Sequence, residues 1–145
     1  MFRSKIAVFV VFVAGLGMAL PALAQPPVVA PEHVPDYWNM TKSEVSGNVP
    51  NTGRKLDQPG CVAVSYMIGS DGVPQHVMAR KVVPSDSDFG YIAVSLVRNF
   101  RYAASSDNNA DQPINTYYVV RFNMPKDAAR QAALLKQCEL SGYGD

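Results

Sequence analysis

The sequence has few of the residues that several functional classes of protein need in number. Of its 145 residues only 17% are charged, two are Cys, two are His and one is Trp, and Lys plus Arg exceed Asp plus Glu by 13 to 12. Two Cys exclude a disulfide-dense scaffold, and a formal charge of +1 gives no basic surplus for nucleic acid or an anionic membrane. Because 48% of the residues are hydrophobic, a wholly disordered chain is also excluded, and one globular domain is expected.

Catalytic and metal-binding patterns are also missing. His33 and His76 lie far apart in the sequence, with no Asp, Glu or Cys near either at the spacing of metal ligands. No Ser lies in a nucleophile elbow, and no Gly-rich phosphate loop occurs. Asp86 and Asp88 are typical of a helix start rather than of an acid–base pair. The sequence therefore predicts no enzyme, no cofactor, no metal site and no nucleic-acid partner.

An exported precursor is indicated by the N-terminus. A short basic stretch precedes the uncharged apolar run Ile6–Leu20, and a small-x-small cleavage pattern ends at Ala24. The run is shorter than the roughly 20 residues that a transmembrane helix needs. We therefore predict a signal peptide over 1–24 and a mature periplasmic chain from Gln25. Removing the two basic residues of this segment from the 13 leaves 11 against 12 acidic residues, a balance of −1. The alternative is a retained helix that anchors the protein on the periplasmic side of the inner membrane.

The two cysteines, Cys61 and Cys138, have an evident use in an oxidising compartment. Exported thiols that occur as a pair usually close a disulfide, and no CxxC motif or nearby His favours a redox or metal role. We therefore predict a disulfide between them. Prolines are concentrated before Cys61, which predicts a loosely ordered Pro-containing leader over 25–59. Within it, Trp38 either ties the leader to the domain or contacts a ligand.

The remaining chain, 60–141, has the patterns of a folded domain. Alternation predicts two strands joined by an Asp-Gly turn, which form an antiparallel hairpin. An apolar stripe at helical spacing follows, then a long alternating strand and a second helix-forming run. The expected elements are strands at 61–68 and 74–83, a helix that begins within 84–86 and continues to 100, a strand at 114–124 and a helix at 126–140.

The order strand, strand, helix, strand restricts the topology. A right-handed crossover from the second strand to a parallel third strand places the first strand between them. We therefore predict an α+β domain: a small three-stranded antiparallel or mixed sheet of order 2-1-3, packed by one helix. The added C-terminal helix would be held to it by the disulfide. The third strand then lies at an edge and has unpaired backbone groups.

Four segments of this domain, taken in order, carry a family likeness. They are GCVAVSYMI at 60–68, the turn Ser70-Asp71-Gly72-Val73, the aromatic-Arg-aromatic signature in Asn99-Phe100-Arg101-Tyr102, and the closing Val119-Val120-Arg121-Phe122. Together they resemble the C-terminal domain of the TonB energy-transducer family, as a short stand-alone member. The resemblance runs from Gly60 to about Pro125. That family links an inner-membrane motor to outer-membrane receptors.

The resemblance implies that the third strand accepts an extended peptide from a protein partner, such as an outer-membrane receptor, by strand addition in transport across the outer membrane. Carried over, the partner-binding residues are Tyr117, Tyr118, Val119, Val120, Arg121, Phe122 and Asn123. The helix from Lys126 either covers this edge or packs on the opposite face of the sheet. Two alternatives stay open: a short energy transducer that keeps its N-terminal helix in the membrane, and a structural envelope protein that reuses the fold without strand addition.

Overall fold

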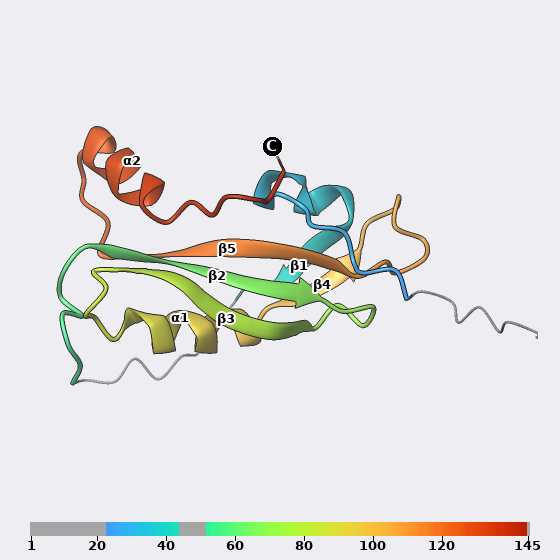
Figure 1. Cartoon of the computed structure of the whole chain (residues 1–145), viewed down its shortest axis with the longest axis horizontal. Helices are drawn as coiled ribbons and strands as arrows, with labels where there is room; N and C mark the ends of the chain where they lie inside the picture. The colour runs from blue at the N-terminus through green and yellow to red at the C-terminus, as the bar shows by residue number, and fades with distance from the viewer. Residues whose placement is uncertain (1–22, 44–51, 145) are drawn as a thin grey trace, which may run out of the picture.

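A computed structural model describes residues 23–43 and 52–144 of the chain (Figure 1). The predicted signal peptide, apart from its last two residues, lies outside the described residues. The elements are a 3-10 helix η1 (Pro31–Asp36), strands β1 (Trp38–Lys42), β2 (Gly60–Ile68) and β3 (Pro74–Val83), helix α1 (Phe89–Arg98), strands β4 (Arg101–Ala104) and β5 (Ile114–Phe122), and helix α2 (Ala128–Lys136). None of the helices in the described ranges is long and apolar enough to cross a bilayer.

The α+β fold expected from the sequence is confirmed, with β2 at the centre of a three-stranded sheet of order β3-β2-β5. Both neighbours run antiparallel to β2, which is the 2-1-3 order. Alternate residues of β2 face opposite sides of the sheet. Val62, Val64 and Ile68 pack in the core that includes α1, whereas Cys61 and Ala63 pack in a smaller cluster with residues of the C-terminal segment. Because both faces of β2 are covered, this strand is buried almost throughout.

Helix α1 begins at Phe89, which is later than the sequence predicted. Residues before it form a turn, in which the backbone N–H and hydroxyl of Ser87 both donate to the carbonyl of Pro84, at 3.1 and 2.7 Å. The carboxylate of Asp88 accepts hydrogen bonds from the backbone N–H and guanidinium of Arg54, which hold its pKa below the usual range. It therefore does not cap the helix. The buried stripe of α1 consists of Phe89, Ile92, Ala93, Leu96 and Val97.

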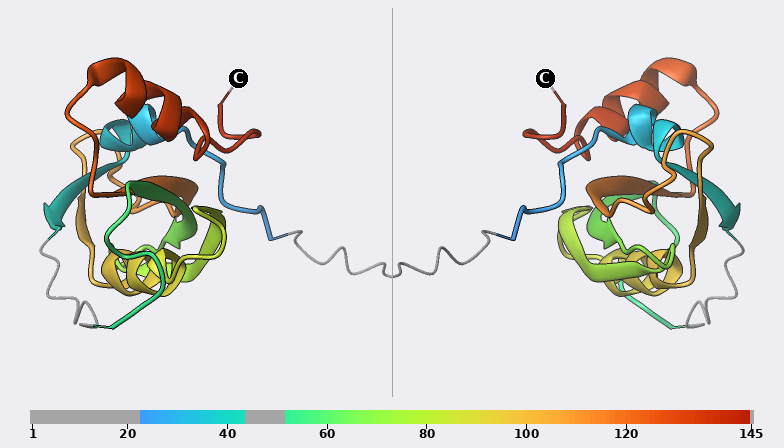
Figure 2. Two further views of the ribbon diagram at one scale, coloured as in Figure 1. Left: turned by 90° about the vertical axis from the view of Figure 1, so that its left-hand side faces the viewer. Right: turned by 90° about the vertical axis from the view of Figure 1, so that its right-hand side faces the viewer.

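The predicted disulfide is confirmed, and it joins β2 to the segment that follows α2. The Cα atoms of Cys61 and Cys138 are 6.2 Å apart, and both residues are fully buried. Helix α2 is shorter than predicted at both ends: the side chain of Asp127 caps its start by accepting from the N–H of Arg130 at 2.8 Å, and the helix ends at Lys136. Figures 1 and 2 show α2 on the face of the sheet opposite α1.

Part of the segment that the sequence assigned to the leader is folded onto the domain. Strand β1 pairs antiparallel with β4 in a two-stranded ribbon that lies beside the central sheet (Figure 2). Trp38 at the start of β1 is only 2% exposed, and its indole N–H donates to the carbonyl of Gln112 at 2.9 Å. Burial of this large ring accounts for the docking. Trp38 therefore ties this segment to the domain, which is one of the two roles that the sequence left open for it.

Candidate functional site

The outer edge of β5 is the side of this strand that faces away from β2. At its beginning, Asn115 exchanges two backbone hydrogen bonds of 2.8 Å with the segment before η1, accepting from Val29 and donating to Pro27. The backbone groups of every second residue of a strand point the same way. Those of Tyr117, Val119 and Arg121 therefore point to the outer edge. No hydrogen bond joins them to any residue in the described ranges.

The two edges of the central sheet differ in their regularity. The pairing of β5 with β2 runs from Ile114 to Phe122 without a register shift. The pairing of β3 with β2 contains two irregularities, and β3 carries His76, Arg80 and Lys81. Bulges and basic side chains are common means of protecting a sheet edge from strand pairing. The β3 edge is protected in this way, whereas β5 presents a regular edge.

Helix α2 leaves the outer edge of β5 uncovered. Its partners lie on the face of the sheet opposite α1: Leu134 and Leu135 pack with Cys61 and Ala63. The ring of Tyr117 belongs to the same cluster and meets the ring of Tyr143 edge-on, with centroids 4.9 Å apart. Of the two positions that the sequence left open for the added helix, the structure therefore has the one on the opposite face.

Two hollows follow the outer edge of β5, one on each face of the sheet. The first, of about 460 Å³, lies over the apolar side chains of Ile92 and Leu96 of α1 and of Val120 and Phe122 of β5. The second, of about 500 Å³, is bordered by Glu32 and by Tyr117, Val119 and Arg121. Side chains of a strand laid against β5 would alternate between these two hollows.

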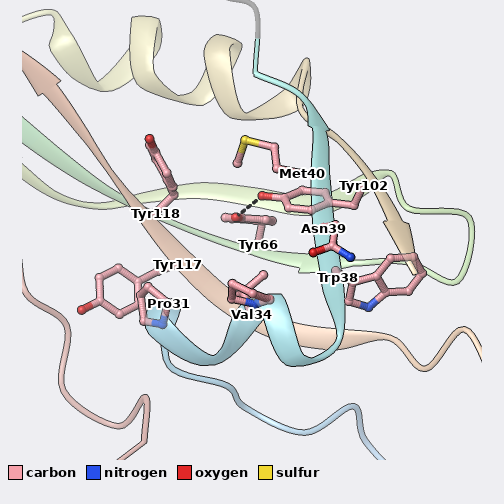
Figure 3. Close-up of a pocket in the computed structure, with 10 residues that line it drawn as sticks. Pro31, Val34, Trp38, Asn39, Met40, Tyr66, Tyr102, Tyr117 and Tyr118 are labelled. Carbon is pink, nitrogen blue, oxygen red and sulfur yellow. Dashed lines mark hydrogen bonds between the residues drawn. The ribbon is translucent and has the colours of Figure 1, made fainter. Parts of the chain in front are cut away.

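A third hollow, named here the aromatic pocket, lies between β5 and β1 above η1 (Figure 3). Its volume is about 180 Å³. Tyr117 and Tyr118 contribute to it from β5, and Met40 reaches it from β1. Among the described residues, the lining is Pro31, Val34, Pro35, Trp38, Asn39, Met40, Tyr66, Tyr102, Tyr117 and Tyr118, and none of these side chains is charged.

Three polar side-chain groups of this pocket already have hydrogen-bond partners. The hydroxyls of Tyr66 and Tyr102 lie 2.6 Å apart and are hydrogen-bonded. Burial raises the pKa of Tyr102 to about 12 and raises that of Tyr66 well above its usual range. Both groups are therefore neutral at physiological pH. The indole N–H of Trp38 is already bonded to Gln112. The pocket thus offers mainly apolar and aromatic surface.

The site residues carried over from the family resemblance do not all direct their backbone groups to the outer edge of β5. Tyr118 and Val120 have backbone groups that point to β2, and they offer only side chains to the surroundings. Asn123 lies after the end of β5, and its side-chain amide donates to the carbonyls of Leu56 and Gln58 at 2.7 and 3.0 Å. Asn123 therefore holds a neighbouring loop and contributes no group to the edge.

The sequence did not predict the aromatic pocket, because its residues come from five elements spread over residues 31 to 118. The two adjacent tyrosines, Tyr117 and Tyr118, were a possible signal. Successive side chains of a strand point to opposite faces of the sheet, so the two rings could not both face the same side. Within the described ranges, no three His, Cys, Asp or Glu side chains gather where they could hold a metal ion. No family model, curated protein or solved structure matches this chain.

Proposed function

We propose that the mature chain is a periplasmic interaction module that binds an extended peptide as an added strand on the outer edge of β5. The observation that carries the proposal is the row of backbone groups at Tyr117, Val119 and Arg121, which point away from β2 and have no hydrogen-bond partner among the described residues. Strand addition uses backbone hydrogen bonds for affinity and alternate side chains for selectivity. The regular register of β5 and the hollows on both sides of its edge suit an extended chain.

The partner we propose is an N-terminal peptide of an outer-membrane receptor, as the resemblance to the TonB C-terminal domain family implies. The 2-1-3 sheet order and the open third strand support this choice. A membrane-anchored transducer would use the same edge and would differ in its N-terminus. Mass spectrometry of the protein from cells separates these two forms, since cleavage leaves Gln25 as the first residue. In the alternative of a structural envelope protein without strand addition, we expected the C-terminal helix to cover the edge; the packing of α2 with Cys61 and Ala63 favours the interaction module.

Two substitutions at one position of the edge test the proposal. The N–H of Val119 points away from β2, so Val119→Pro removes an outward donor while the bonds to β2 remain. Val119→Thr keeps the N–H and serves as the matched control. Circular dichroism checks that both variants fold. We expect receptor N-terminal peptides to bind the wild type and Val119→Thr alike and to bind Val119→Pro at least about tenfold more weakly, a loss typical of one backbone hydrogen bond.

Amide chemical shifts of isotope-labelled wild-type protein locate the binding. The expected shifts fall on Tyr117, Val119 and Arg121. Peptides that leave these amides unmoved, or that bind Val119→Pro as tightly as the wild type, would overturn the proposal.

A further inference from the structure

We infer that the aromatic pocket anchors one bulky, uncharged apolar side chain at the end of the peptide that adds to β5. This inference rests on the proposed function, and it names the chemistry of one ligand residue. The pocket is continuous with the edge, because Tyr117, whose backbone groups point to the outer edge, also lines the pocket.

The segment that is already bonded to the beginning of the β5 edge determines which peptide residue can reach the pocket. The segment Pro27–Val29 is bonded to Asn115 and takes the place of an added strand there. A peptide laid along Tyr117–Arg121 therefore stops short of Asn115, where this segment already occupies the edge. The aromatic pocket opens at that point, between β5 and β1 (Figure 3). The terminal side chain of the peptide is the one that can enter it.

The size and lining of the pocket define the side chain that fits. A volume of about 180 Å³ is near that of an apolar cavity of about 150 Å³ known to hold a benzene ring. The lining has no charge to pair with a charged side chain, and the Tyr66 and Tyr102 hydroxyls are bonded to each other. An ionised group placed there would lose hydration and find no opposite charge among these lining residues. Phe and Leu side chains fit, whereas Glu and Lys do not.

The rim of the pocket carries exposed apolar surface. Met40 is 39% exposed and Tyr118 is 41% exposed, although both are large and apolar in character. Both side chains line the pocket (Figure 3). A ring or a branched aliphatic side chain seated in the pocket would remove this surface from water, and that burial is the source of the expected affinity.

The test uses capped hexapeptides that alternate Val and Thr and differ at one terminal position, which is Phe, Leu, Ala, Glu or Lys. Two sets place this position at the N-terminus or at the C-terminus, since a parallel strand brings its N-terminus to Tyr117 and an antiparallel strand its C-terminus. In one of the two sets, we expect Phe and Leu to bind about tenfold more tightly than Ala, and Glu and Lys to bind no better than Ala. The indole N–H signal of Trp38, the one Trp of the chain, should shift with the Phe peptide.

A pair of charged variants provides the control. Met40→Glu places a charge on the pocket rim, whereas Met78→Glu places one at a 54% exposed position on β3. Met40→Glu should abolish the advantage of Phe over Ala, and Met78→Glu should preserve it. If the edge amides shift but Phe and Ala bind equally in both sets, the inference fails while the proposed function stands. If receptor N-terminal peptides also leave the amides of Val119 and Arg121 unshifted, the proposed function fails as well.

Discussion

Replacing Trp38 by Ala should lower the free energy of unfolding by about 3–5 kcal/mol, which is the usual cost of removing a large buried aromatic side chain. Trp38 is 2% exposed and belongs to the main core cluster, although it lies in the segment that the sequence assigned to a loose leader. The loss would show that β1 unfolds together with the central sheet. Trp38→Phe separates the hydrogen bond to Gln112 from the packing and should cost about 1–2 kcal/mol.

Urea denaturation followed by far-ultraviolet circular dichroism measures these losses, because the variants lack the only Trp of the chain as a fluorescent probe. Tyr91→Ala is the control. This residue is 81% exposed on α1, so its loss should change the free energy of unfolding by no more than about 0.5 kcal/mol. A loss below about 1 kcal/mol for Trp38→Ala would refute the reasoning, because it would mean that β1 and η1 are not part of the cooperative unit.

Three further predictions concern other parts of the core. The buried hydroxyl of Thr116 has no hydrogen-bond partner among the described residues, so Thr116→Val should raise the free energy of unfolding by about 1 kcal/mol, and Thr116→Ser should not. The Cys61–Cys138 disulfide joins residues separated by 77 positions, so replacing both by Ala should lower the free energy of unfolding, measured in urea, by about 4–5 kcal/mol. The refolded variant should still bind peptide. Since burial raises the pKa of Tyr102 to about 12, above the value of about 10 in the unfolded chain, stability should be intact below pH 10 and fall by about 2 kcal/mol as the pH rises to 12. In a variant with Phe at both Tyr66 and Tyr102 this fall should be smaller.

The central sheet could be predicted from the sequence because its signals are local. The alternation in β2 and β3 and the Asp71-Gly72 step fix both strands and the turn between them, and β3 has the predicted bounds. Strands β1 and β4 were missed, because a strand of four or five residues has too little alternation to be recognised. Their pairing also joins residues about 60 positions apart, as in Met40 and Tyr102.

The edge of β5 could be predicted from topology, but its accessibility could not. Whether α2 covers the edge depends on where the chain turns after Phe122. Asn123 has a φ of 45°, a left-handed conformation that local patterns rarely reveal, and its side chain is held by carbonyls of a distant loop. The aromatic pocket depends in the same way on the docking of η1 and β1, for which Trp38 was the only signal.

Hydrogen exchange of the β5 amides tests most directly the claim that this strand presents an open edge to a peptide. In the free protein, the amides of Val119 and Arg121 should exchange much faster than those of Tyr118 and Val120, which are bonded to β2. A receptor N-terminal peptide should slow the first pair and leave the second unchanged. Slow exchange at all four amides in the free protein would contradict the account, because it would show that the edge is already paired.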